Sequence, residues 1–234
     1  MVTRLPLPFR GKRQALDPQD PRVESRFRDL YTRVLMHTGV EGHTILGVTS
    51  PIDGEGKTTI ATGLAIRLAN DGALAELTGR AGSILVLECS RGNPEVGREL
   101  GIAATPGLLQ YLGRECPLEA AIKQSTLPAL SVLPLGGVSP NFPILIRTAA
   151  MQDLMERLRE RFDLVVVDLP SAATSTDTQV LGGLADYLLL VVRSGVTPAR
   201  VVRQALEEID AEKLVGIVLN DHHADLPGWL DERL

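Results

Sequence analysis

Residues 48–59 place a glycine-containing loop between an apolar run and a helical pattern, and few folds accommodate that order. They read Val-Thr-Ser-Pro-Ile-Asp-Gly-Glu-Gly-Lys-Thr-Thr, with apolar residues at 44–48 before them and an apolar-periodic stretch at 60–68 after them. A strand, a turn and a helix N-terminus are the context in which a phosphate-binding loop forms. The alternative is a flexible glycine-lysine turn in front of an ordinary helix.

The residue types in this loop suit a nucleoside triphosphate. Gly54 and Gly56 have no Cβ, so the backbone can bend around phosphate oxygens. N–H groups at the helix start, together with the helix dipole, favour an anion there. We predict ATP with Mg²⁺ as the ligand, Lys57 as a catalytic group that reaches the β- and γ-phosphates, and the Thr58 hydroxyl as a metal ligand. The predicted cofactor-binding residues of the loop are Asp53, Gly54, Glu55, Gly56, Lys57, Thr58 and Thr59.

Carboxylates at the ends of two other apolar runs supply the acidic partners that a phosphate loop needs. The run 164–167 leads into Asp168, which we predict to be catalytic and to bind Mg²⁺ through water; the alternative is a cap for the following loop. The run 84–87 leads into Glu88. Glu88 is a candidate catalytic group that orients water or a metal-bound ligand, or it is a structural acid.

The last apolar run, 216–219, ends in an amide side chain, that of Asn220. An amide offers both a donor and an acceptor, which suits adenine, so Asn220 is a predicted cofactor-binding residue. Asparagine also favours turns, and the structural alternative stays open.

The alternation of apolar runs with helical patterns predicts the fold. Several runs, including 84–87, 164–167 and 188–192, are apolar throughout, which is typical of strands covered on both faces of a parallel sheet. The clearest helical patterns are 149–161 and 198–209, the second with proline as its first helical residue. We therefore predict a doubly wound α/β fold with a mostly parallel sheet and helices on both faces. Ligands of such sheets bind at the carboxyl ends of the strands.

Length and charge narrow the functional classes. The chain has 234 residues and a net charge of −5, so it is not expected to bind nucleic acid through bulk positive charge. No apolar run approaches the ~20 residues of a bilayer span, no signal peptide is visible, and the predicted location is cytoplasmic. We divide the chain into an extended arm (1–21), a phosphate-loop ATPase domain (22–220) and a short tail (221–234).

Several stretches in this order resemble one known family. They are residues 49–59, 107–115, 130–137, 161–170, 185–197 and 216–220. Together they are similar to the bacterial tyrosine kinases of capsule and exopolysaccharide biosynthesis, which belong to the deviant phosphate-loop ATPases with the Min and Par partitioning proteins. The resemblance implies a MinD/ParA-like fold, ATP and Mg²⁺ as cofactors, and autokinase activity on tyrosine. It also implies a homo-oligomer and a membrane-bound polysaccharide co-polymerase, or chain-length regulator, as an activating partner that recruits the chain to the inner face of the membrane.

Two departures in the phosphate loop concern the subfamily. Partitioning ATPases carry a signature lysine five residues before the loop lysine, and Ile52 occupies that position here. Pro51 replaces the first glycine of the ordinary motif. Both departures suit the polysaccharide kinases better.

Two further departures concern the kinase reaction. The family's strand-end motif has two aspartates separated by one residue, and Glu88 and Ser90 stand at the matching positions. Serine carries no charge, so slow or absent phosphoryl transfer is expected. The tail 221–234 contains no tyrosine, so autophosphorylation is not expected there. Three functions stay open: a kinase-type ATPase, a kinase-inactive regulatory ATPase or nucleotide switch, and a degenerate nucleotide-binding scaffold.

Overall fold

One sheet of eight strands organises the part of the chain that the computed structural model describes, namely residues 2–4, 27, 29–34, 43–71, 82–90 and 96–221. The strands are β1 (Val2–Arg4), β2 (Thr44–Thr49), β3 (Ile84–Glu88), β4 (Lys123–Gln124), β5 (Leu130–Leu133), β6 (Leu164–Asp168), β7 (Tyr187–Arg193) and β8 (Leu214–Asn220). Their order is β1-β8-β7-β2-β6-β3-β5-β4, and every pair is parallel except β4 with β5. The prediction of a mostly parallel sheet is confirmed.

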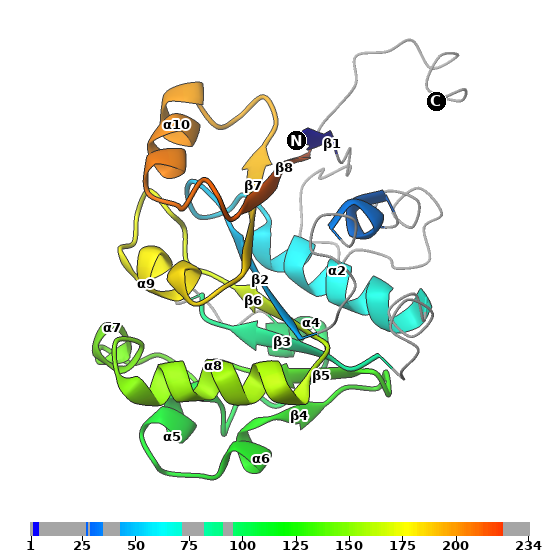
Figure 1. Cartoon of the computed structure of the whole chain (residues 1–234), viewed down its shortest axis with the longest axis vertical. Helices are drawn as coiled ribbons and strands as arrows, with labels where there is room; N and C mark the ends of the chain where they lie inside the picture. Colours follow the sequence, from blue (N-terminus) through cyan, green and yellow to red (C-terminus); the bar gives the residue numbers. More distant parts are fainter. Residues whose placement is uncertain are drawn as a thin grey trace.

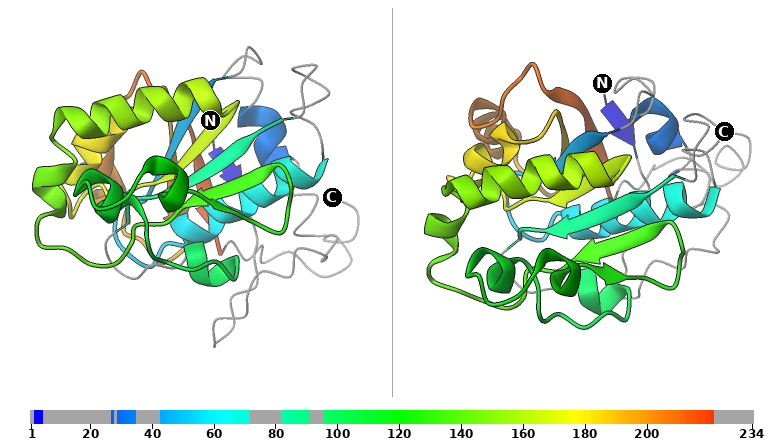
Figure 2. Two further views of the ribbon diagram at one scale, coloured as in Figure 1. Left: turned by 90° about the horizontal axis from the view of Figure 1, so that it is seen from below. Right: turned by 60° about the horizontal axis from the view of Figure 1, so that its bottom comes forward.

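Helices cover both faces of this sheet, as the doubly wound prediction requires (Figure 1). The labelled helices are α2 (Lys57–Asp71), α4 (Val96–Glu99), α5 (Leu108–Leu112), α6 (Leu118–Ala121), α7 (Phe142–Leu145), α8 (Ala149–Arg161), α9 (Asp177–Gly183) and α10 (Ala199–Glu207). Figure 2 shows α8 in front of the sheet and α2 behind it. Residues 29–34 form a further helical segment, which lies next to α2.

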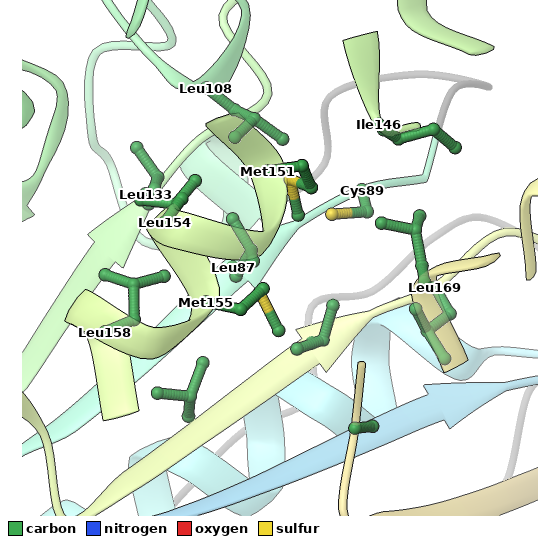
Figure 3. Close-up of a cluster of buried hydrophobic side chains, with 14 of the residues drawn as sticks. Leu87, Cys89, Leu108, Leu133, Ile146, Met151, Leu154, Met155, Leu158 and Leu169 are labelled. Atoms are coloured by element: carbon green, nitrogen blue, oxygen red, sulfur yellow. The ribbon is translucent and has the colours of Figure 1, made fainter. Parts of the chain in front are cut away.

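Strand residues pointing to opposite faces build two separate cores. On one face, Ile45 and Leu87 pack with α8, whose buried residues are Met151, Leu154, Met155 and Leu158 (Figure 3). On the other face, Leu46 and Val48 pack with Ile60, Leu64 and Leu68 of α2. Strands buried on both sides need apolar residues at every position, which explains the unbroken apolar runs in the sequence. The methionines of α8 belong to the core that contains Ile45 and Leu87.

Parallel pairing brings the predicted site residues to one edge of the sheet. The register pairs Val48 of β2 with Asp168 of β6, and Asp168 with Glu88 of β3. All three residues lie at or next to the carboxyl ends of their strands, where the loop after β2 begins. The edge therefore gathers the phosphate loop and both predicted carboxylates.

Residues 2–4, at the start of the predicted extended arm, pair with Ile217–Leu219 as an edge strand, and most of the arm lies outside the described residues. The structure differs from the sequence prediction at two places. The antiparallel strand β4 was not predicted. Pro198 precedes the first residue of α10 and acts as its N-cap, so its place as the first helical residue was wrong by one position.

Candidate functional site

The loop between β2 and α2 has the backbone of a phosphate cradle. Gly54 and Gly56 have φ values of 87° and 89°, in the left-handed region that other residues avoid. Helix α2 begins directly afterwards at Lys57, and the Ile60 N–H already donates to Gly56 O at 3.0 Å. Thr59 lies on the first turn, half-buried. The predicted order of strand, loop and helix N-terminus is present, and a helix N-terminus of this kind is suited to bind an anion through its backbone N–H groups.

Thr58 and Asp168 meet beside this cradle, although they lie far apart in the sequence. The Thr58 hydroxyl donates to Asp168 Oδ2 at 2.9 Å, and both residues are buried. A hydroxyl beside a carboxylate is an oxygen donor set that fits Mg²⁺, which usually takes one or two protein ligands and completes its shell with phosphate oxygens and water. The structure thus brings together the two residues predicted as metal ligands.

Lys57 is held by an anionic side chain of its own loop. Its Nζ lies 3.5 Å from Asp53 Oδ1, and the Ser171 hydroxyl donates to the same oxygen. The Lys57 side chain is 8% exposed, whereas that of Asp53 is 78% exposed. Sequence reasoning missed Ser171; the signal available was its place three residues after Asp168, in the loop at the same sheet edge.

The Glu88 carboxylate is occupied by backbone donors. Its Oε1 accepts from Val96 N–H and its Oε2 from Leu135 N–H, both at 3.1 Å, and the residue is 1% exposed. These bonds tie the end of β3 to the start of α4 and to the segment after β5. The geometry favours the structural alternative for Glu88, and a catalytic role stays a prediction.

Replacing Glu88 by glutamine distinguishes the two roles. The amide would turn an N–H toward a backbone N–H, leaving a buried donor unsatisfied, so the free energy of unfolding should fall by about 1–3 kcal/mol. ATP affinity should stay within about threefold. Chemical denaturation and calorimetric titration measure both quantities. Glu119→Gln is the control, because that side chain is 73% exposed. A stable Glu88→Gln variant without turnover would support the catalytic role instead.

Cys89 and Ser90 continue the chain beyond β3 at the same edge. The Cys89 N–H donates to Asp168 O at 2.9 Å, so this segment still follows β6. Burial raises the pKa of the Cys89 thiol, and the nearby Asp168 and Glu88 carboxylates raise that pKa further. Cys89 is thus a buried core residue with a protonated thiol. Ser90 is 8% exposed, at the position where the family motif has its second aspartate.

Asn220 contacts the phosphate loop itself. Its Nδ2 donates to Glu55 O at 2.8 Å, and a Cβ on Gly56 would lie only 2.3 Å from that nitrogen. The Asn220 Oδ1 atom is buried and has no hydrogen-bond partner among the described residues. Adenine recognition by Asn220 stays a prediction. The Glu55 side chain is 2% exposed and turns toward β7.

Comparisons with known proteins place this chain in a family. No protein-family model matches the chain. The tyrosine-protein kinase YwqD of Bacillus subtilis is 30% identical over 175 residues, which cover 74% of this chain and 70% of the relative. The chain belongs to the bacterial tyrosine-protein kinase family. Another member of this kinase family, CpsD of Streptococcus agalactiae serotype III, is 28% identical over 204 residues, covering 86% and 84% of the two chains. The family resemblance seen in the sequence is confirmed.

A longer relative and two solved structures extend the comparison to chain length and to the fold. The succinoglycan biosynthesis transport protein ExoP of Rhizobium meliloti is 33% identical over 181 residues, and the match covers 75% of this chain but 22% of ExoP. The chimerical protein CapA2B2 superimposes with a TM-score of 0.78 at 26% identity, covering 89% and 88% of the two chains. The cell division ATPase MinD of Pyrococcus furiosus, with a TM-score of 0.61 at 20% identity over 81% and 78%, shares the fold. The predicted MinD-like fold is confirmed.

The described residues include no helix that combines the length and the apolarity needed to cross a bilayer.

Proposed function

We propose that this protein binds Mg·ATP at the loop between β2 and α2 and cleaves its γ-phosphate. The observation that carries the proposal is the contact between Thr58 and Asp168 at 2.9 Å, at the foot of a loop with two left-handed glycines. A hydroxyl and a carboxylate beside a row of helix N–H groups match the metal half and the phosphate half of an ATP site.

Each residue of this site has a distinct task in the proposed reaction. The loop amides and the N-terminus of α2 bind the phosphate oxygens, and Lys57 places its ammonium group on the β- and γ-phosphates. Thr58 and Asp168 hold Mg²⁺, which when bound neutralises the charge that develops on the phosphoryl group. Asp53 orients Lys57, and the Ser171 hydroxyl holds Asp53 in place. The buried surroundings of Thr58 and Asp168 strengthen the charge interactions at the metal.

We further propose that a tyrosine hydroxyl of a protein accepts the γ-phosphate and that the reaction serves polysaccharide biosynthesis. Two relatives are named tyrosine-protein kinases, and a third, ExoP, is named for succinoglycan biosynthesis transport. A membrane-bound co-polymerase is the proposed activator, and it would recruit the chain to the inner face of the membrane. Assembly of several copies belongs to the same proposal.

Ser90 and Glu88 favour a second candidate, a regulatory ATPase without kinase activity. Serine supplies no negative charge at position 90, and the Glu88 carboxylate already accepts two backbone N–H groups. In this second candidate, the residues for phosphoryl transfer are altered, while those for binding nucleotide and Mg²⁺ are kept. Nucleotide state would then control oligomerisation or partner binding.

Purified protein incubated with γ-labelled ATP and Mg²⁺ tests both candidates when free phosphate and phosphotyrosine are measured separately. Phosphotyrosine supports the kinase, and free phosphate alone supports the regulatory ATPase. If ATP binds but no label appears as free phosphate or phosphotyrosine, the result supports a nucleotide-binding scaffold without turnover. Without binding, the whole assignment would be wrong.

Replacing Ser90 by aspartate is expected to raise phosphate release by about tenfold. The change restores a carboxylate at the position where the family motif has its second acid, and a positioned acid or base contributes a factor of this size or more. Phosphate release at saturating Mg·ATP measures it. Ser131→Asp on β5 adds the same charge away from the carboxyl-end edge and should change nothing. Equal rates in wild type and Ser90→Asp would place position 90 outside the metal's surroundings or make Glu88 sufficient.

A further inference from the structure

Glu55 differs from its neighbours in the phosphate loop because its side chain is buried. Asp53 and Gly54 are exposed, whereas Glu55 is 2% exposed. A carboxylate in a loop that receives a triphosphate adds negative charge where the ligand is already strongly negative. A physical reason for its presence must therefore lie in what the carboxylate contacts.

Both carboxylate oxygens of Glu55 accept hydrogen bonds from the segment after β7. The Thr197 hydroxyl lies 2.6 Å from Oε1 and 2.7 Å from Oε2, and the Arg193 N–H donates to Oε2. Thr197 lies just before α10, and Arg193 ends β7. Hydrogen bonds to an ionised acceptor are shorter and about twice as strong as neutral ones.

The backbone of Glu55 is fixed at the same point by a second strand. Asn220, the last residue of β8, donates its Nδ2 hydrogen to Glu55 O at 2.8 Å. The next residue, Gly56, has its left-handed φ of 89°, and α2 starts one residue later. The orientation of the amides at the start of α2 therefore depends on where Glu55 is held.

We propose that Glu55 and Thr197 form a positioning pair that holds the phosphate loop in its binding conformation before nucleotide arrives. This inference rests on the proposed ATP binding. It assigns to residues 193–197 the task of holding Glu55 in place. A preformed loop spares the ligand the cost of ordering it, so the pair contributes to affinity although neither side chain touches phosphate. Thr197 acts through Glu55 and is a positioning residue.

Removing the Thr197 hydroxyl tests the pair. Thr197→Val leaves one side of a buried carboxylate unsatisfied, and the dissociation constant of a fluorescent ATP analogue with Mg²⁺ should rise about tenfold. Thr197→Ser keeps the hydroxyl and should restore the wild-type value within about twofold. Thr148→Val is the matched control, because it removes a hydroxyl with a 2.7 Å bond to Leu145 O on another element, and it should leave the constant unchanged.

A double-mutant cycle shows whether Thr197 works through Glu55. In a Glu55→Ala background, Thr197→Val should raise the dissociation constant by less than about twofold, because the carboxylate that Thr197 contacts is already absent. Circular dichroism confirms that each variant is folded.

The outcomes separate this inference from the proposed function. A wild-type chain that fails to bind the analogue overturns both. A wild-type chain that binds, with Thr197→Val binding equally well, overturns the pair alone. If Thr197→Val weakened nucleotide binding equally in the wild-type chain and in the Glu55→Ala variant, the pair would also be overturned. Thr197 would then act on the nucleotide directly.

Discussion

Replacing Lys57 by methionine should weaken Mg·ATP binding by at least about 100-fold while the fold survives. The ammonium group is expected to bond both the β- and γ-phosphates, and each bond to a charged group contributes about 1.5–3 kcal/mol. Two such bonds correspond to about two orders of magnitude or more in the dissociation constant. Isothermal titration calorimetry in Mg²⁺ buffer measures the change.

The fold should tolerate the substitution because Lys57 contributes little to stability. Its ion pair joins it to Asp53, whose side chain is 78% exposed, and pairs of this kind stabilise a protein by less than about 1 kcal/mol. Lys123→Met removes one positive charge from β4, an outermost strand separated from β2 by three others, and this variant should bind ATP normally. Normal affinity in a folded Lys57→Met variant would refute the phosphate-loop assignment.

Replacing Asp168 by asparagine should reduce ATP hydrolysis by about 100-fold or more, with a smaller effect on nucleotide binding. Asparagine has the same shape, but it loses the charge that helps to hold Mg²⁺, and metal stabilisation of phosphoryl transfer contributes several kcal/mol. Asp168 is fully buried, so no solvent charge can replace it. Phosphate release measured over a range of Mg²⁺ concentrations shows the loss directly, and affinity for ATP in EDTA should change little.

Asp163 offers a matched control for that experiment. It lies just before the other end of β6, where its Oδ2 accepts 2.8 Å bonds from Ser83 N–H and from the Ser83 hydroxyl. Asp163→Asn should therefore lower stability without changing the metal dependence of hydrolysis. If both variants lost hydrolysis equally, the effect would come from damage to β6 and not from the metal site.

The parallel strands could be predicted because burial on both faces leaves a mark in the local sequence. Runs such as 84–87 and 164–167 are apolar at every position, and the structure places both in the middle of the sheet. The two-residue strand β4 leaves no such mark. Lys123 and Gln124 are polar and pair with β5 only because the chain folds back on itself there.

The candidate site likewise contains residues whose positions local sequence predicts and residues whose contacts it does not predict. Lys57 and Thr58 could be predicted because their positions follow from the local order of strand, loop and helix, and Asp168 because parallel strands share a carboxyl-end edge. The directions of the Glu55 and Glu88 side chains could not be predicted. Their partners include Thr197, 142 residues away from Glu55, and Leu135, 47 residues away from Glu88, and no local pattern specifies contacts of that span.

The two edge strands of the sheet affect how this protein can bind other protein chains. Its outermost strands are β1, with three residues, and β4, with two. Strands this short present few unpaired N–H and C=O groups, and natural proteins use them to prevent a foreign strand from joining the sheet. Docking by β-augmentation is therefore disfavoured on both sides, and contacts between subunits or with a recruiting protein are expected to form through side chains on the helices and loops.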